Sequence, residues 1–341
     1  MAFWDWNEYE AFLDWSAMNG YNLILDIVGQ EEVLRRTLNK FGYSDEEIKE
    51  YISGPGYFAW FYMQNMTSFG GPLPNSWFED RTELGRKMHD RMQTLGITPV
   101  LQGYSGGVPL DFTEKNPDAQ VIKQGEWCGF DRPDMLRTYV AEGEEDYFAK
   151  VADAFYEAQK EVFGEVSDYY AVDPFHEGGN TGGLDNGRIY STVQNKMLEH
   201  DEDAIWVIQH WQGNPDNAKL SGLNKEHSLI LDLNSDLNPD WQRFDNQDLP
   251  WVWNMLHNFG GRMGLDGQPE ILANNIPSSY AKSENMKGIG ITPEAINNSP
   301  IVYELIGDMI WTRDAIDFRQ WTMDYICLLY TSPSPRDVEE S

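Results

Sequence analysis

The sequence of 341 residues contains very little cysteine and comparatively few basic residues. Its two cysteines, Cys128 and Cys327, are too few for a disulfide framework and lack the spacing of metal ligands. Against 56 Asp and Glu there are only 25 Lys and Arg, which gives a formal net charge of −31. This charge argues against nucleic acids and anionic membrane surfaces as partners, because both would be repelled. It also disfavours a polyanionic substrate unless the site itself is basic.

Several familiar signals are also missing from the sequence. No apolar run approaches the ~18 residues of a membrane span, and the N-terminus has no signal-peptide pattern. No Gly-x-Ser-x-Gly elbow exists, and the glycine-rich turn 178–183 lacks the Lys-Ser/Thr of a phosphate loop. His176, His210 and His257 form no His-x-His or His-x-x-x-His pair, so hydrogen-bonding histidines are a better interpretation than metal ligands. We therefore expect no metal and no cofactor.

Helical and strand-like segments alternate along the whole chain. Most of the strand-like runs are separated by helical segments, which favours an α/β (β/α)8 barrel, a fold of typically ~250 residues that tolerates insertions. A doubly wound open sheet is the alternative, but it would require a glycine-rich phosphate turn after an early strand, and none is present. The short apolar runs that predict strands are residues 21–27, 97–103, 169–175, 204–211, 227–233, 250–256 and 287–292.

Seven predicted strands are one fewer than the eight of a complete barrel. We therefore expect the first barrel strand to lie upstream of Trp4 and the chain to be N-terminally truncated. We predict a catalytic barrel over residues 1–326 and an irregular tail over 327–341. The tail is unlike the preceding sequence and suggests either a non-native end or a disordered linker. Residues 104–135 form a long excursion of the kind that is usually functional or disordered, and Trp127 and Phe130 favour an ordered loop.

Two of the strand-like runs stop abruptly on a glutamate, at Glu177 and at Glu294. In a barrel, catalytic groups lie at the C-terminal ends of strands. Two carboxyl groups placed there match glycoside hydrolysis, in which one protonates the leaving oxygen and the other attacks the anomeric carbon. The 13 Trp and 17 Tyr fit either a well-packed core or platforms that stack on sugars. Polar or aromatic residues occupy every predicted strand end, namely Asp26, Gln102, Asp173, His176, Glu177, Gln209, His210, Trp211, Asp232, His257, Asn258 and Glu294.

Longer motifs resemble a known family. Gly-Pro-Leu-Pro-Asn-Ser-Trp at 71–77, Trp-Asn-Met-Leu-His-Asn-Phe-Gly-Gly at 253–261 and Gly-Ile-Gly-Ile-Thr-Pro-Glu at 288–294 closely resemble glycoside hydrolase family 89, the α-N-acetylglucosaminidases. Trp-Asp-Trp at 4–6 and Trp-x-x-Met-Asn-Gly at 15–20 agree with it. The motifs follow one another in the family's order.

The resemblance extends from about Phe3 to Asp314 and implies a retaining enzyme that removes terminal α-linked N-acetylglucosamine. Carried over, Glu177 is the acid/base and Glu294 the nucleophile. Asp232 and Asn258 lie beside pocket positions, and we expect them to bind sugar hydroxyls. His176 stands where the animal members have Asn. The pocket positions implied by the resemblance are Trp60, Met63, Trp127, His176, Trp211, Leu233 and Phe259.

Members of the family also have a small N-terminal α/β domain, a C-terminal helical domain and, by habit, an export signal, which here would lie upstream. The expected partner is a glycan that ends in N-acetylglucosamine, either mucin-type or heparan-sulfate-type, and the negative charge favours the neutral mucin-type. A catalytically inactive sugar-binding barrel is the alternative from another class. An exo-glycosidase of the same architecture with a different sugar preference is the third hypothesis.

Overall fold

A computed structural model describes residues 1–129, 137–140, 147–258, 268–294 and 298–331. The chain divides into two compact units. Unit 1 contains Met1–Leu231 and Asp248–Pro250, and unit 2 contains Asp232–Gln247 and Trp251–Ser341. We describe each unit separately.

Unit 1 is organised around a sheet with the strand order β1-β2-β5-β6-β7. The pairs β1–β2, β2–β5 and β5–β6 are parallel, so the carboxyl ends of these four strands lie at one edge of the sheet. Each strand falls within a run that the sequence predicted. The strands are β1 (Leu23–Leu25), β2 (Thr98–Gln102), β5 (Tyr169–Ala171), β6 (Ile205–His210) and β7 (Ser228–Asp232).

The strands read as continuous apolar runs because helices cover them. Trp206, Val207 and Ile208 of β6 are completely buried, as expected for a parallel strand with both faces covered. The helices of unit 1 are α1 (Trp6–Met18), α2 (Gln30–Asn39), α3 (Asp45–Tyr51), α4 (Phe58–Tyr62), α5 (Asn75–Leu95), α6 (Phe112–Lys115), α7 (Tyr147–Phe163), α8 (Asn186–His200) and α9 (Asn217–Leu220).

Local sequence signals set the ends of these helices. Asp5 opens α1 and Ser44 opens α3, each with a capping box in which the side chains and backbone amides satisfy one another. Gly96 ends α5 in the left-handed conformation, at φ 72°, and the amide of Ile97 returns to the carbonyl of Met92 at 2.8 Å. This turn leads the chain directly from α5 into β2.

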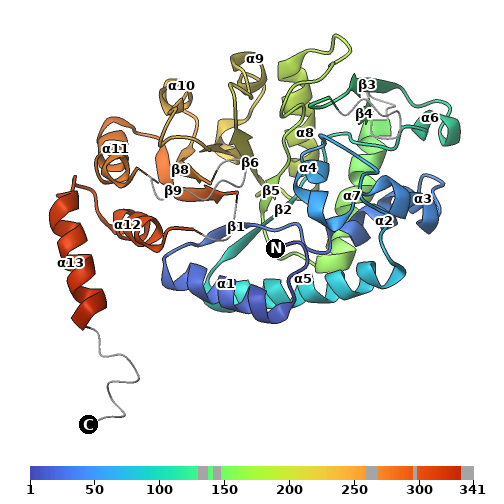
Figure 1. Ribbon diagram of the computed structural model, residues 1–341. Coiled ribbons are helices and arrows are strands. Elements are labelled where there is room, and N and C mark those ends of the chain that lie inside the picture. Colours follow the sequence, from blue (N-terminus) through green and yellow to red (C-terminus); the bar gives the residue numbers. More distant parts are fainter. Residues whose placement is uncertain (130–136, 141–146, 259–267, 295–297, 332–341) are drawn as a thin grey trace. The chain divides into compact units, whose positions relative to one another are not determined.

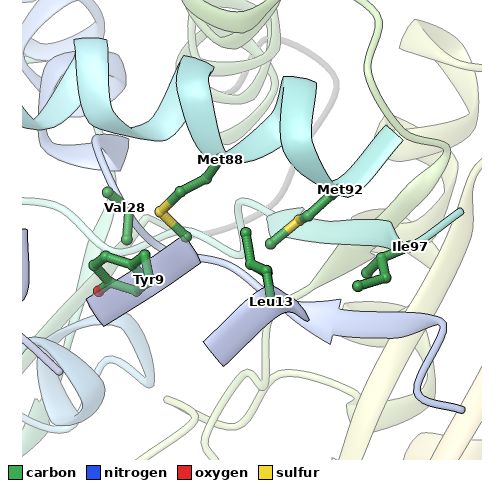
Figure 2. Packing of buried hydrophobic residues seen from close by; sticks show 6 residues of the cluster. All are labelled: Tyr9, Leu13, Val28, Met88, Met92 and Ile97. Carbon is green, nitrogen blue, oxygen red and sulfur yellow. The ribbon is translucent and has the colours of Figure 1, made fainter. Parts of the chain in front are cut away.

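One part of the core joins α1 to α5, which lie side by side (Figure 1). Figure 2 shows Leu13 of α1 pointing toward Met88 and Met92 of α5. Leu13 and Met92 are fully buried, and Tyr9, Val28 and Ile97 complete the cluster. The methionines of α5 therefore fill the core, where their flexible thioethers adapt to irregular gaps.

The long excursion after β2 contains a hairpin that the sequence analysis did not predict. β3 (Val121–Gly125) pairs antiparallel with β4 (Arg137–Val140), and Trp127 lies just beyond the end of β3. The prediction of order is confirmed for this part of the excursion. Phe130, the second residue on which that prediction depended, lies outside the described residues.

Unit 2 contains the parallel pair of strands β8 (Trp251–His257) and β9 (Met286–Pro293), both of which were predicted. Helix α11 packs against β9 and against α12 (Figure 1). Ser299 precedes α12 and Pro300 is its first residue, as the sequence indicated. The helices of this unit are α10 (Trp241–Asp245), α11 (Pro269–Lys282), α12 (Pro300–Trp311) and α13 (Phe318–Thr331).

Helix α13 corrects one detail of the predicted tail. Cys327 to Thr331 were expected to be irregular, but they form the last turns of this helix. The rings of Trp321 and Tyr325 stack at 5.3 Å, an i,i+4 contact that supports the helix at its centre. Residues 332–341, the rest of the predicted tail, lie outside the described part of the chain.

Candidate active site

Glu177 is reached by a short turn that leaves the carboxyl end of β5. Phe175 takes a left-handed conformation at φ 56°, and the amide of Gly178 returns to its carbonyl at 3.2 Å. Asp173, two residues after the strand, accepts hydrogen bonds at 2.8 Å from the backbone and side-chain amides of Gln209 on β6. Burial raises the pKa of the Asp173 carboxyl. These bonds tie the turn that carries Glu177 to the neighbouring strand.

The carboxylate of Glu177 accepts three N–H donors from three other segments of unit 1. Asn65 Nδ2 lies 3.1 Å from Oε2, and Trp127 Nε1 lies 2.5 Å from the same oxygen. Trp211 Nε1 donates to the other oxygen, Oε1, at 3.2 Å. The side chain of Glu177 is only partly buried, so it remains open to a ligand. Donors on both oxygens fix the orientation of the Glu177 carboxylate.

Asn65 belongs to a closed loop between Gly54 and Gly70 that also contains α4. The amide of Gly54 donates to the carbonyl of Phe69 at 2.7 Å. A Cβ on Gly54 would lie 2.0 Å from the carbonyl oxygen of Gly70, so only glycine allows this approach. After α4, Gln64 is left-handed at φ 59°, and Asn65 N bonds Trp60 O at 2.9 Å. The asparagine is thereby turned inward, with 1% of its surface exposed.

Trp211 is presented by a tight turn after β6. Trp211 and Asn214 exchange both backbone hydrogen bonds at 2.9 Å, and Gln212 and Gly213 between them have φ of 51° and 81°. Positive φ at both central residues is the type I′ geometry, which favours Asn and Gly. The turn holds Trp211 at the end of the strand, where its indole reaches Glu177.

Of the other pocket residues implied for unit 1, Trp60 and Met63 lie in the loop that carries Asn65, and His176 directly precedes Glu177. Trp60 on α4 is exposed, and its ring lies 6.3 Å from that of Trp127, which is half-buried. Met63, the residue after α4, is also half-buried. His176 is 4% exposed, and its Nδ1 has no partner among the described residues. Exposed indole faces beside a carboxylate are suited to a sugar, whose C–H groups stack on aromatic rings.

Glu294 in unit 2 follows the carboxyl end of β9 and is exposed. Its amide donates to the carbonyl of His257 on β8 at 3.1 Å, which extends the strand pairing by one residue. His257 Nδ1 lies 3.2 Å from the hydroxyl of Tyr303. Asn258, at φ 58°, donates through Nδ2 to Asn298 Oδ1. His257 is therefore held by α12, and Asn258 by the segment that precedes α12.

Asp232 and Leu233 are buried in the structure. Asp232 is 0% exposed, and its Oδ2 accepts from Ser235 Oγ at 2.9 Å and from the amide of Asp240 at 3.0 Å. The carboxylate thus fixes the loop that follows β7. Leu233 is 6% exposed. Their predicted roles toward a sugar stay predictions, and Phe259 lies outside the described residues.

Some polar strand ends belong to the interior of the protein. Asp26 accepts from the amide of Val28 at 2.9 Å, and His89 Nε2 lies 2.9 Å from its other oxygen, with both side chains buried. The side chain of Gln102 bonds the carbonyl of Tyr62 at 3.3 Å and so connects β2 to α4. These residues support the site without facing it.

Asn65 is the site residue that the sequence analysis missed. It lies in a loop, where no periodicity marks it, and it is 112 positions away from Glu177. Within the part of the chain that the structure describes, no cluster of three or more His, Cys, Asp or Glu is arranged to hold a metal ion. Cys128 and Cys327 are both exposed, and none of the described helices is long and apolar enough to cross a membrane.

Comparison with known proteins gives a consistent result. A family profile described as "Alpha-N-acetylglucosaminidase (NAGLU) tim-barrel domain" matches residues 1–313. Human alpha-N-acetylglucosaminidase is 31% identical over 98% of this chain and 47% of its own length. A family 89 glycoside hydrolase from Clostridium perfringens, solved in complex with GlcNAc-alpha-1,4-galactose as its substrate, is 72% identical with a TM-score of 0.92.

The bacterial structure covers 96% of this chain and 37% of its own chain, so the sequence spans less than half of either relative. An alpha-amylase from Geobacillus thermoleovorans, at 8% identity, has a TM-score of 0.52 over 88% of this chain and 70% of its own, a likeness of fold alone. The predicted (β/α)8 fold class is confirmed by the matching profile. The chain belongs to the family of the α-N-acetylglucosaminidase TIM-barrel domain, glycoside hydrolase family 89.

Proposed function

We propose that this chain is the catalytic barrel of a retaining exo-glycosidase that releases terminal α-linked N-acetylglucosamine from glycans. The observation that carries the proposal is the carboxylate of Glu177, which follows a barrel strand and is held on both oxygens. Two of its donors are half-buried indole rings, and the exposed ring of Trp60 lies beside one of them. The 72% identity to a family 89 hydrolase solved with GlcNAc-alpha-1,4-galactose supports the choice of sugar.

Two glutamates have the catalytic roles in this proposal. Glu177 protonates the glycosidic oxygen while a carboxylate oxygen of Glu294 forms a bond to the anomeric carbon, and the bond to the leaving group breaks. A water molecule then attacks the anomeric carbon of the glycosyl-enzyme. It gives its proton to Glu177 and releases Glu294, which restores both side chains. The relative from C. perfringens was solved with its substrate as a variant with two Glu-to-Gln substitutions, separated by nearly the same number of residues as Glu177 and Glu294.

The test of the proposal is the hydrolysis of 4-nitrophenyl α-N-acetylglucosaminide by the 341-residue chain. We expect turnover by the unsubstituted chain and a loss of at least about 10³-fold in Glu294→Ala, because no covalent intermediate can form. Glu284→Ala is the matched control, since Glu284 is an exposed glutamate before β9. Turnover that survives in Glu294→Ala would contradict the assigned nucleophile.

Azide separates the two roles. Azide attacks the glycosyl-enzyme without the help of a general base. In Glu177→Ala it should therefore restore turnover of an activated aryl glycoside and yield a glycosyl azide of retained configuration. In Glu294→Ala, azide attacks the anomeric carbon directly in the place of the missing carboxylate, so any glycosyl azide formed by this variant should have the inverted configuration. If the unsubstituted chain binds GlcNAc-alpha-1,4-galactose but does not cleave any glycoside, the hydrolase proposal fails for this chain and a sugar-binding barrel takes its place.

A further inference from the structure

The donors to Glu177 are distributed unequally over its two oxygens. Among the described residues, Oε2 accepts from both Asn65 Nδ2 and Trp127 Nε1, whereas Oε1 accepts only from Trp211 Nε1. A carboxylate oxygen has two lone pairs in the carboxyl plane, which makes about four acceptor positions for the group. Both positions of Oε2 are therefore occupied by N–H groups. One position remains at Oε1, and it is the only place on the group where a proton meets no competing donor.

This asymmetry matters for an acid catalyst. A protonated carboxyl carries its proton on one oxygen, and the proton reaches the leaving group only if it is on the oxygen that faces it. An N–H group pointing at Oε2 would collide with an O–H hydrogen placed on that oxygen. The two donors at Oε2 therefore direct the proton to Oε1, and removing one of them opens a second, unproductive position.

From this geometry we propose that Asn65 is a positioning residue for general acid catalysis, which anchors Oε2 of Glu177 and so makes Oε1 the oxygen that delivers the proton to the glycosidic bond. The inference rests on the proposed function, since it assigns to Glu177 the role of acid. During the step, the Oε1–H bond breaks, the proton bonds to the glycosidic oxygen, and Glu177 is left as a carboxylate with its three N–H donors in place.

The surroundings of Asn65 argue against a purely structural role for its side chain. The loop from Gly54 to Gly70 is closed by backbone hydrogen bonds, and the Asn65 amide group takes no part in that closure. Asn65 is 1% exposed, and its Oδ1 has no partner within the described residues. A buried amide oxygen without a hydrogen bond is unfavourable relative to an apolar side chain of the same shape. Among the described residues, the side-chain amide of Asn65 makes one hydrogen bond, and it is the bond to Glu177.

Leaving-group dependence tests the proposal, because acid assistance matters most when the leaving group is a poor one. Asn65→Leu keeps the branched shape of the side chain, at a somewhat larger volume, but removes the donor. We expect kcat/KM for GlcNAc-alpha-1,4-galactose to fall by about 10- to 100-fold, a part of the 10²–10⁴-fold that general acid catalysis supplies. The value for 2,4-dinitrophenyl α-N-acetylglucosaminide should change less than about 3-fold, since its leaving group departs without protonation.

Met66→Leu is the matched control, because Met66 is buried in the same loop and the substitution conserves volume. It should leave both substrates unaffected. Equal losses on the two substrates in Asn65→Leu would contradict the proposal and indicate a general distortion of the site. Absence of turnover in the unsubstituted chain would instead contradict the proposed function.

The indole N–H resonances give a second readout that does not depend on turnover. Trp127→Phe and Trp211→Phe assign the two signals in a ¹⁵N–¹H spectrum. Because Asn65 and Trp127 share Oε2, Asn65→Leu should shift the Trp127 signal and affect that of Trp211 much less. An unchanged Trp127 signal would show that Asn65 does not anchor this oxygen, and the proposal would be wrong whether or not the chain is active.

Discussion

Glu31 is a carboxyl group buried away from the solvent in the first turn of α2. It is 1% exposed, and its Oε1 accepts from Trp77 Nε1 at 2.8 Å. Burial raises its pKa to about 7, and the charge of Asp26 adds to the rise, whereas the Trp77 bond and the charge of Arg81 oppose it. The folded protein therefore holds a proton on Glu31 at pH values at which an unfolded chain has lost it.

The sign of the resulting pH dependence follows from proton counting. Between the ordinary pKa of 4.5 and about 7, the folded state binds more protons at Glu31 than the unfolded state does. The free energy of unfolding consequently falls as the pH rises through this window and levels off above it. We expect Glu31→Gln to remove a decline on the order of 3 kcal/mol, measured by urea denaturation at pH 5 and pH 8.

Glu79→Gln is the control for this prediction, since Glu79 is an exposed glutamate on α5 and the chemical change is the same. Its stability should follow that of the unsubstituted chain at both pH values. If Glu31→Gln shows the same pH dependence as the unsubstituted chain, Glu31 is ionised in the folded protein and the prediction is wrong.

At the residue scale, sequence reasoning finds groups that end a regular element and misses those that act from loops. Glu177 was found because the apolar run that predicted a strand at 169–175 leads up to it, although the strand itself ends at Ala171. Asn65 bonds the same carboxylate, but it lies in a loop 112 residues away, and only the closure of that loop brings them together. Asp26 shows the converse case, since it is a polar residue at a strand end whose partners, Val28 and His89, are internal.

At the scale of elements, the loop from Gly54 to Gly70 places three residues of the candidate site. Its ends come so close that a Cβ on Gly54 would overlap the carbonyl oxygen of Gly70 at 2.0 Å. We expect Gly54→Ala to force the loop open, at a cost of about 1–3 kcal/mol in unfolding free energy. Turnover should fall more strongly than stability, because Trp60, Met63 and Asn65 would all move.

Gly56→Ala is the control within the same loop. A Cβ at Gly56 meets nothing within 4 Å, so this variant should retain both stability and turnover. Thermal unfolding and nitrophenyl-glycoside hydrolysis of the two variants test whether the close approach at Gly54 holds the loop. Similar behaviour of Gly54→Ala and Gly56→Ala would mean that the close approach does not hold the loop.

The elements that were predicted correctly are those with a strong local pattern. All seven predicted strands exist, and β6, with Trp206, Val207 and Ile208 completely buried, shows most clearly how an apolar run fits a covered parallel strand. The β3–β4 pair was missed, since β3 is mostly half-exposed and carries no clear alternation. Helix α13 was partly missed because its last residues were judged by their amino-acid composition alone. Helical contacts such as the stacking of Trp321 on Tyr325 were not considered.

For the whole molecule, the net charge of −31 bears on the choice of glycan. A sulfated substrate approaching this field is repelled at low salt, and the repulsion weakens as the Debye length shrinks from about 30 Å at 0.01 M to about 8 Å at 0.15 M ionic strength. If the proposed hydrolase activity holds, kcat/KM for a sulfated α-GlcNAc disaccharide should rise about 3- to 10-fold over this range of salt.

The neutral GlcNAc-alpha-1,4-galactose provides the comparison, since it carries no charge that salt could screen. Its kcat/KM should therefore stay within about 2-fold over the same range of salt. The contrast between the two substrates separates steering from any general effect of salt on the protein. A sulfated substrate that is cleaved faster than the neutral one at low salt would require a basic surface at the site strong enough to outweigh the overall charge. That result would favour heparan-sulfate ends over neutral mucin-type glycans as the substrate class.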